Sequence, residues 1–226
     1  MRRNVAIVGA GIGAEHAHAY QLCSSRWRIA TMCDLDASRG EALAQANNAA
    51  FTSRFEAVLN DPEIDVVDIC TPPHAHFEMM CQALAAGKHV ICEKPLGTSL
   101  AQIDHLKELS LVQKTDVFPV FQYRYGPGMT QMRALLKTGL CGNCSAASLE
   151  THWCRDKVYY EAAPWRGTWA GEQGGAMVSH AIHIHDLLTC LLGPVASVYA
   201  RLDTRVNAIE TEDCAALPIK MNPVLL

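Results

Sequence analysis

The sequence opens with a short apolar run and a glycine-rich turn, Val5-Ala-Ile-Val-Gly9-Ala-Gly11-Ile-Gly13-Ala14. Gly9, Gly11 and Ala14 satisfy the pattern G-x-G-x-x-G/A, and helix-like sequence follows. In this pattern Gly9 permits a tight bend, Gly11 lets backbone amides approach a pyrophosphate, and Ala14 lets helix and strand pack closely. The N–H groups that begin the helix favour bound phosphate. The turn, with Ile12 and Gly13, therefore predicts a dinucleotide-binding site.

The first half of the chain alternates between apolar runs and amphipathic segments. Short apolar runs separated by helices indicate strands that are buried on both faces of a parallel sheet. Right-handed crossovers then predict a doubly wound α/β fold. Pro119 lacks an N–H donor, which places the last strand at an edge, and Gly87 is placed to cap a helix in left-handed geometry. The predicted strands are Val5–Val8, Ile29–Cys33, Val66–Cys70, His89–Cys92 and Val117–Phe121, and the predicted helices are Glu15–Ser24, Ala37–Asn47, His74–Ala86 and Leu100–Gln113.

The pattern changes after Tyr125. We predict a dinucleotide-binding domain over residues 1–123 and a second α/β domain with an open sheet over residues 124–226. The second domain offers few elements for a core, so we expect it to be incomplete, with an exposed sheet face that favours a homodimer or homotetramer. Its predicted elements are helices Met129–Lys137 and Ala176–Leu192 and strands Ala146–His152, Val198–Leu202 and Cys214–Ile219.

Composition narrows the class of protein. The 226 residues contain 19 Lys and Arg and 23 Asp and Glu, a formal charge of −4, which gives no case for nucleic acid as a partner. No apolar run approaches the roughly 20 residues of a membrane span. We expect a soluble, cytoplasmic chain. Its ten cysteines include a lone pair, Cys141-Gly-Asn-Cys144, with no second pair to complete a zinc site.

Asp34 ends the second predicted strand, 21 residues after Gly13. An acid at this place accepts a hydrogen bond from a ribose 2′-OH, which favours NAD. Arg39 lies close by in the sequence and is suited to a 2′-phosphate, so NADP stays open.

Glu93-Lys94-Pro95 follows another predicted strand. Ligands of open α/β sheets bind at the carboxyl ends of strands. Pro95 moves Lys94 out of helical geometry and permits a cis peptide bond. The turn is therefore suited to aim the Lys94 ammonium in one direction, although an exposed turn lysine is the simpler interpretation.

Four motifs in order resemble one oxidoreductase family, and the resemblance extends over almost all of the chain. They are Gly9–His16, Asp65–His74, Ala86–Leu96 and Gly174–Leu188. The chain resembles the glucose-fructose oxidoreductase, inositol dehydrogenase and rhizopine-catabolism (Gfo/Idh/MocA) family. The resemblance implies an N-terminal Rossmann domain and a C-terminal α/β domain whose large open sheet holds the substrate and usually the oligomer contact. Because members are usually much longer, we expect this chain to lack the last part of that sheet.

The resemblance also assigns residues to the cofactor. Thr71, Pro72 and His74 would border the nicotinamide ribose, and Glu93 would hold a cofactor ribose. Gln122 matches a position that faces the nicotinamide.

On the substrate side, the resemblance implies that Lys94 hydrogen-bonds the reacting oxygen and that His183 is the acid–base residue. Arg124 matches a position that faces substrate. Ser179 stands where the family often has Asp, and a hydroxyl cannot raise the basicity of an imidazole as a carboxylate does. Regular helical spacing places Ser179 and Asp186 on the same face as His183.

Two further sets of side chains have alternative interpretations. His180, His183 and His185 with Asp186 could form a metal cluster, but zinc needs convergent ligands and the helix turns His180 and His185 apart, so we expect no metal. Trp165 and Arg166 are suited to stacking on a polyol or clamping it; packing and a solvated rim explain them equally well.

The combined prediction is an NAD(P)-dependent oxidoreductase acting on a secondary hydroxyl or keto group of a sugar, cyclitol or related polyol. A second hypothesis is glycoside cleavage with a tightly held NAD, as in some relatives. A third is a shortened, non-catalytic protein that only binds the dinucleotide.

Overall fold

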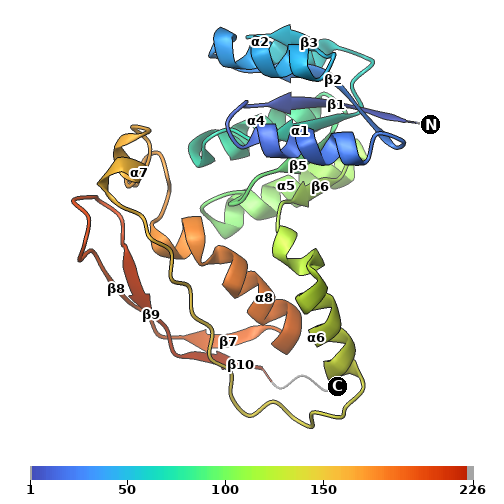
Figure 1. Cartoon of the computed structure of the whole chain (residues 1–226). Coiled ribbons are helices and arrows are strands. Elements are labelled where there is room, and N and C mark those ends of the chain that lie inside the picture. Colours follow the sequence, from blue (N-terminus) through green and yellow to red (C-terminus); the bar gives the residue numbers. More distant parts are fainter. Residues whose placement is uncertain (1, 223–226) are drawn as a thin grey trace. The chain divides into compact units, whose positions relative to one another are not determined.

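The computed structural model describes residues 2–222. The chain forms two compact units that divide between Val120 and Phe121. Figure 1 shows the helices and strands of both units along the chain.

The first unit contains a six-stranded sheet in the order β3-β2-β1-β4-β5-β6, with every neighbouring pair parallel. The doubly wound fold is therefore confirmed, and β6 lies at an edge as Pro119 predicted. The strands are β1 (Arg3–Val8), β2 (Trp27–Cys33), β3 (Ala50–Thr52), β4 (Val66–Ile69), β5 (His89–Cys92) and β6 (Val117–Pro119). The helices are α1 (Gly13–Leu22), α2 (Ala37–Ala46), α3 (Phe55–Asn60), α4 (Pro73–Ala85) and α5 (Leu100–Gln113).

Alternate residues of β1 pack into two different cores. Ala6 and Val8 join the cluster that includes Leu84 of α4 and Leu106 of α5. Val5 and Ile7 join the cluster that contains Ala17 of α1 and Ala44 of α2. Because neighbouring side chains of a strand point to opposite faces, the sheet is buried on both sides. This burial explains why the strands appear in the sequence as continuous apolar runs.

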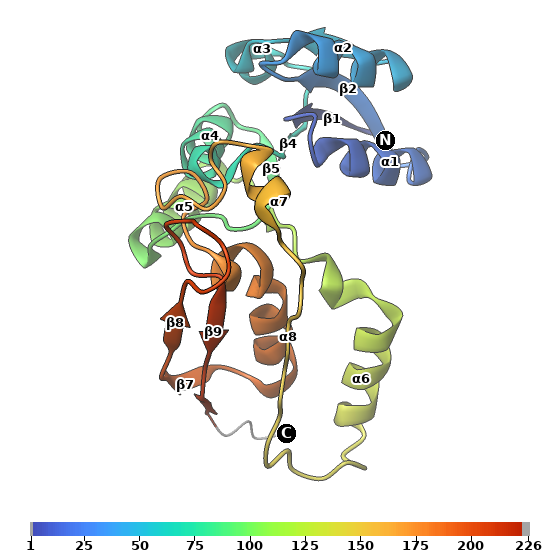
Figure 2. The same ribbon diagram turned by 60° about the vertical axis from the view of Figure 1, so that its left-hand side comes forward.

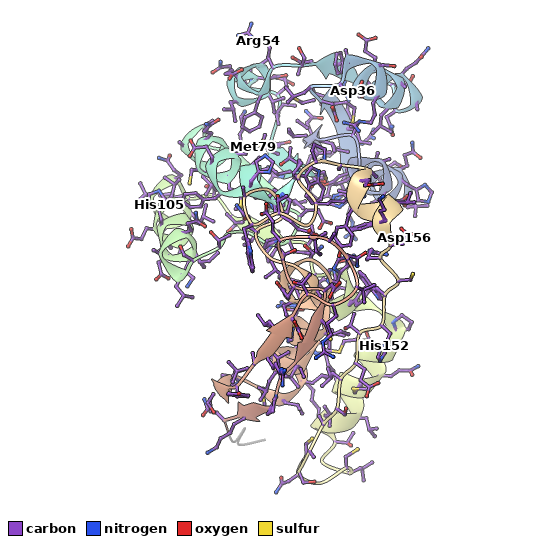
Figure 3. All side chains as sticks on the ribbon, turned by 90° about the vertical axis from the view of Figure 1, so that its left-hand side faces the viewer. Asp36, Arg54, Met79, His105, His152 and Asp156 are labelled. Atoms are coloured by element: carbon purple, nitrogen blue, oxygen red, sulfur yellow. The ribbon has the colours of Figure 1, made fainter. Side chains whose placement is uncertain are left out.

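Two local devices set the helix ends of this unit. Asp36, labelled in Figure 3, accepts a hydrogen bond from the Arg39 N–H (3.1 Å) and begins α2. Gly87 has φ +72° after α4, the left-handed cap that its position predicted. The sequence did not predict β3 and α3, since β3 is only three residues long and depends on pairing with β2.

The second unit begins with a short 3-10 helix, η1 (Gln122–Tyr125), and contains two small antiparallel pairs, β7 with β10 and β8 with β9 (Figure 2). The other elements are α6 (Pro127–Lys137), α7 (Lys157–Glu161), η2 (Ala176–His180), α8 (Ile182–Leu192), β7 (Val195–Val198), β8 (Arg201–Asp203), β9 (Cys214–Ala216) and β10 (Ile219–Met221). Asp156 caps α7 through the Tyr159 N–H (3.0 Å; Figure 3).

Four predictions for this unit are wrong. The predicted strand Ala146–His152 has no strand partner in the described chain and lies as extended, largely exposed backbone. The predicted helix Ala176–Leu192 is divided at Ala181 into the π-helix η2 and the α-helix α8. Val198–Leu202 is divided between β7 and β8, and Cys214–Ile219 between β9 and β10, because each piece pairs with a different partner.

Candidate functional site

In the glycine turn after β1, two glycines are packed too closely for a side chain and a third has free space around it. Gly9 has φ +98°, and a Cβ there would lie 2.6 Å from the Cys70 carbonyl oxygen. A Cβ on Gly13 would lie 2.9 Å from Ile7 Cγ2. A Cβ on Gly11 would meet nothing within 4 Å. The fold itself therefore requires Gly9 and Gly13, whereas the open space at Gly11 fits the close approach of a phosphate group.

The predicted packing role of Ala14 is wrong. Ala14 is exposed, and the small residues that α1 buries are Gly13, next to Ile7 of β1, and Ala17. The side chain of Ile12 is also exposed. In the first turn of α1 the N–H groups of Ala14 and Glu15 donate to the carbonyl oxygens of Gly11 (3.2 Å) and Ile12 (3.0 Å). The positive end of the helix dipole still favours an anion beside this turn.

Asp34 joins the end of β2 to this turn. Its Oδ2 accepts a hydrogen bond from the Ala10 N–H (2.5 Å), its Oδ1 accepts one from the Asp36 N–H (2.8 Å), and Arg39 Nη2 lies 3.1 Å from Oδ1. Burial would raise the pKa of Asp34, but these hydrogen bonds outweigh it and hold the pKa below its usual value. Asp34 is therefore an ionised carboxylate fixed beside the glycine turn, with Arg39 as its counterion. A glycine turn suited to the pyrophosphate, next to a carboxylate suited to a ribose hydroxyl, is the arrangement expected of a dinucleotide-binding site.

The turn after β5 is held to its neighbours by its backbone. The Lys94–Pro95 peptide bond is cis, as the sequence permits. The Glu93 N–H donates to the Ile69 carbonyl oxygen (2.9 Å), which places the turn beside the end of β4. The buried ring of His76 spans two loops, with Nδ1 2.7 Å from the Pro95 carbonyl oxygen and Nε2 2.7 Å from that of Thr71.

His76 was not among the predicted site residues. Its neighbour His74 is exposed at the start of α4, beside Thr71 and Pro72. Two histidines two residues apart on one helix face different environments, and their burial could not be distinguished from the sequence. The structure brings Thr71, Pro72, Glu93 and Lys94 to the carboxyl ends of β4 and β5, the edge at which ligands of such sheets bind.

A hydrogen-bonded cluster around His16, which includes Glu93, was also not predicted from the sequence. His16 of α1 lies between Asp68 of β4 (Nδ1 to Oδ2, 2.9 Å) and Glu93 (Nε2 to Oε1, 3.2 Å). The Tyr20 hydroxyl donates to Asp68 Oδ2 (2.9 Å), and Cys70 Sγ lies 3.4 Å from His16 Nδ1. Burial alone would lower the pKa of His16, but hydrogen bonds with Asp68, Cys70 and Glu93 raise it to about 12.

His16, Asp68 and Cys70 offer three donor atoms within 4.8 Å of one another, a set that could hold a metal ion. The hydrogen bonds already explain why these atoms are close, and Asp68 is fully buried. We therefore describe the cluster as a hydrogen-bonded network.

In the second unit, η1 and α8 meet around His183. The Tyr123 ring stacks on the His183 imidazole, with centroids 4.8 Å apart and planes at 28°, and Phe121 approaches its edge at 6.1 Å. Arg124 donates from Nε (2.6 Å) and Nη2 to the Asp186 carboxylate. Asp186 lies on α8 with His183, and its carboxylate binds the Arg124 guanidinium.

The start of η2 is held by a residue far along the chain. Buried Glu212 accepts hydrogen bonds from the N–H groups of Gly175 (3.0 Å) and Met177 (3.0 Å) through its carboxylate, and its carbonyl oxygen accepts one from Ala176 (2.7 Å). The Ser179 hydroxyl, in η2, donates to the Gly174 carbonyl oxygen (3.5 Å). Because Ala181 interrupts the helix, Ser179 and His183 do not have the regular spacing that the sequence predicted.

Trp165 and Arg166 belong to a stack of rings and guanidinium groups. The Arg166 guanidinium lies 4.1 Å from the Tyr159 ring centroid and 5.3 Å from that of Trp165. The Arg155 guanidinium lies 4.6 Å from the Tyr159 centroid and donates to His180 Nε2 (3.0 Å). Among residues 2–222 neither arginine forms an ion pair with a carboxylate.

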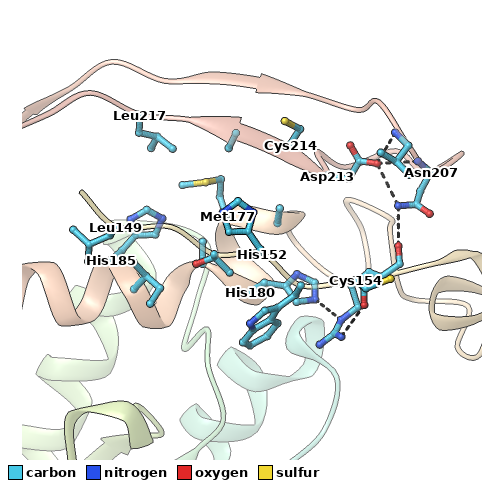
Figure 4. A pocket seen from close by; sticks show the side chains of 18 of the residues that line it. Leu149, His152, Cys154, Met177, His180, His185, Asn207, Asp213, Cys214 and Leu217 are labelled. Atoms are coloured by element: carbon cyan, nitrogen blue, oxygen red, sulfur yellow. Dashed lines mark hydrogen bonds between the residues drawn. The ribbon is translucent and has the colours of Figure 1, made fainter. Parts of the chain in front are cut away.

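A pocket of about 730 Å³ lies between α8, β9 and the extended segment around Trp153 (Figure 4). Its wall from α8 contains Ile184 and His185, not His183. Burial lowers the pKa of His185. The pocket wall therefore includes Arg155 but not the predicted acid–base residue His183.

The site residues are thus divided between the units. Lys94 and the predicted cofactor residues other than Gln122 lie in the first, and the second contains Gln122, Arg124, Trp165, Arg166, Ser179 and His183. Their joint action on one substrate stays a prediction. Within residues 2–222, no helix is both long and apolar enough to cross a membrane.

Comparison with known families gives two matches. The model of an oxidoreductase family with an NAD-binding Rossmann fold matches residues 3–120. The model of the GFO/IDH/MocA C-terminal domain matches residues 129–222.

Individual relatives are similar over most of this chain. The uncharacterized oxidoreductase sll0816 of Synechocystis sp. is 32% identical over 96% of this chain and 62% of its own length. Levoglucosan dehydrogenase of Pseudarthrobacter phenanthrenivorans is 30% identical over 89% of this chain and 54% of its own. The chain therefore spans less than two thirds of the length of these relatives.

A crystal structure of the WlbA dehydrogenase from Bordetella pertussis, in complex with NADH and UDP-GlcNAcA, is similar with a TM-score of 0.93 and 28% identity. The match covers 98% of this chain and 68% of the WlbA chain.

Proposed function

Because this chain belongs to the Gfo/Idh/MocA family of NAD-binding oxidoreductases, we propose that it oxidises or reduces a secondary hydroxyl or keto group of a sugar or related polyol. The observation that supports this proposal most directly is the hydrogen bond that joins Asp34 to the glycine turn. Asp34 accepts it from the Ala10 N–H at 2.5 Å, next to Gly11, where a Cβ would meet no atom within 4 Å. A bound nicotinamide would supply the hydride chemistry.

The protein's own residues would handle the proton and the negative charge. We assign to His183 the removal of the hydroxyl proton, because imidazole titrates near neutral pH. We assign to Lys94 a hydrogen bond to the same oxygen, where its ammonium stabilises the developing negative charge. Tyr123 holds the His183 ring by stacking, and Arg124 is held in turn by Asp186.

NAD is the proposed cofactor. The ionised, buried carboxylate of Asp34 is suited to accept from ribose hydroxyls and repels a 2′-phosphate. Arg39 neutralises part of this charge and would itself attract a 2′-phosphate, so we expect preference for NAD rather than exclusion of NADP.

For the substrate, we propose a sugar with an acidic group. Arg155 and Arg166 both stack on Tyr159, which restricts their motion, and neither has a carboxylate partner in residues 2–222. Restrained guanidinium groups without a counterion favour a carboxylate or phosphate ligand. The similar WlbA structure is a complex with UDP-GlcNAcA, an acidic nucleotide sugar.

We also propose a cytoplasmic homodimer or homotetramer. Val195, Val198 and Tyr199 expose large apolar surface at and after β7. Size-exclusion chromatography with light scattering tests this, and a monomer at micromolar concentration would contradict it.

The proposed activity is tested first by fluorescence titration of the purified chain with NADH and with NADPH. Sugars, sugar acids and nucleotide sugars are then screened with the cofactor that binds. Lys94→Ala and His183→Ala should each lower turnover by at least about 100-fold, the usual contribution of a positioned acid or base, while NADH still binds.

Matched exposed residues give the controls, Lys107→Ala and His18→Ala, and both should keep wild-type turnover. Failure to bind either dinucleotide, or full turnover by the Lys94 and His183 variants, would contradict the proposal. A cofactor that survives dialysis without net NADH formation would favour glycoside cleavage instead.

A further inference from the structure

His16 is placed between two acids that come from different strands. Asp68 lies on β4, and Glu93 directly follows β5. The side chain of Asp68 is fully buried, and those of His16 and Glu93 are only 14% and 12% exposed. Water therefore contributes little to the solvation of any of the three groups.

The geometry requires a charged imidazole. Both ring nitrogens of His16 face carboxylate oxygens, Nδ1 at 2.9 Å from Asp68 and Nε2 at 3.2 Å from Glu93. A neutral imidazole has one N–H and would leave one carboxylate facing a lone pair. Only the imidazolium donates to both, and ion pairs of this kind in a low dielectric are strong when every partner is hydrogen-bonded.

The cluster connects two parts of the proposed cofactor site. His16 lies in the first turn of α1, directly after the glycine turn that would receive the pyrophosphate. His16 Nε2 bonds the first turn of α1 to Glu93 Oε1. The second oxygen of this carboxylate, Glu93 Oε2, accepts a hydrogen bond from the Lys94 N–H (3.2 Å). One hydrogen-bonded path therefore runs from α1 to the Glu93–Lys94 turn.

We propose that His16 is a positioning residue that couples the phosphate-binding start of α1 to Glu93, so that the pyrophosphate and the nicotinamide ribose of the dinucleotide are bound cooperatively. The inference rests on the proposed function, since it assumes that Glu93 holds the nicotinamide ribose of the cofactor. His16 itself touches no cofactor atom in this account and acts through Glu93.

The test compares a whole dinucleotide with a fragment. ADP contains the adenosine and both phosphates but lacks the nicotinamide ribose, so only NADH engages Glu93. His16→Gln should weaken NADH binding about tenfold, which is about 1.4 kcal/mol, and change ADP binding less than twofold. The matched control is His18→Gln, an exposed histidine on the same helix, which should change neither affinity.

A second variant guards against a folding defect. Asp68→Asn keeps the size of the side chain and removes the charge that stabilises the imidazolium, and it should also weaken NADH binding more than ADP binding. In the wild type, ¹⁵N NMR of the histidine ring should show an imidazolium signature for His16 up to at least pH 9.

Several results would overturn the proposal. The first is an equal loss of NADH and ADP affinity in His16→Gln and Asp68→Asn, which would indicate a structural role only. The second is unchanged NADH binding in both variants. The third is one zinc ion per chain in native mass spectrometry after incubation with zinc chloride, lost in His16→Gln, which would assign the cluster to a metal. If the wild type binds ADP and NADH with equal affinity, the cooperativity is absent although the dinucleotide site remains; if it binds neither, the proposed function fails as well.

Discussion

Arg124 donates two hydrogen bonds to the carboxylate of Asp186, 62 residues further along the chain. This pair joins η1 to α8, and the Tyr123 ring beside it stacks on His183. The proposed acid–base residue is therefore held by contacts with the segment that begins the second unit.

Asp186→Asn should destabilise this arrangement. Asp186 is buried while the Arg124 side chain is 36% exposed, so the loss lies between that of an exposed and a buried pair, about 2 kcal/mol. Denaturant unfolding measures it. The matched control is Asp203→Asn, which removes an Arg–Asp pair at the exposed surface and should leave the unfolding midpoint unchanged. Equal effects of the two variants would contradict the prediction.

The two glycines of the phosphate turn should respond differently to the same change. Gly11→Ala adds a methyl group to open space, so stability should be unchanged while NADH affinity falls about tenfold. Gly13→Ala brings a methyl group to 2.9 Å from Ile7 Cγ2 and should cost about 1–3 kcal/mol of stability. Thermal unfolding and NADH titration of both variants separate the effects. Unchanged NADH binding by Gly11→Ala would exclude phosphate approach at this point.

Arg39 should affect the choice of cofactor. Arg39→Ala removes the guanidinium bonded to Asp34, so NADPH affinity should fall about tenfold and NADH affinity should change less than threefold. Fluorescence titration with both dinucleotides measures the ratio, and Arg54→Ala, at an exposed arginine of the same unit, is the control. A parallel fall in both affinities would show that Arg39 does not discriminate between them.

The stability contributed by His16 should decrease as the solution becomes alkaline. The pKa of His16 rises from 6.5 to about 12 on folding, so its contribution is complete below pH 6.5 and is lost progressively as the pH rises towards 12. The other groups that face it do not reverse this trend: the pKa values of Tyr20 and Cys70 are raised by burial and by Asp68, and that of Glu93 is lowered.

Urea unfolding of the wild type and His16→Gln at pH 6, 8 and 10 tests this dependence. The difference in the free energy of unfolding should be largest at pH 6 and smallest at pH 10. A difference that does not change with pH would mean that folding does not raise the pKa of His16.

The first unit was predicted closely because its elements depend on local patterns. The predicted limits of α5 and β5 are those observed, and the end of α4 just before Gly87 follows from glycine's freedom at positive φ. The glycine turn was located correctly, but the packing role was assigned to Ala14 instead of Gly13, since which residue faces Ile7 depends on how α1 crosses β1.

Local apolar periodicity, turn residues and the glycine spacing were enough to establish a parallel α/β unit with a dinucleotide turn, because each acts over a few neighbouring residues. The His16–Glu93 contact joins residues 77 positions apart, and Glu212 holds η2 from 35 or more positions away. Such contacts exist only once the strand order has placed β4 between β1 and β5 and the loops have closed. The same reason explains the segment Ala146–His152: its sequence favours a strand, but a strand forms only where a partner offers its own N–H and carbonyl groups.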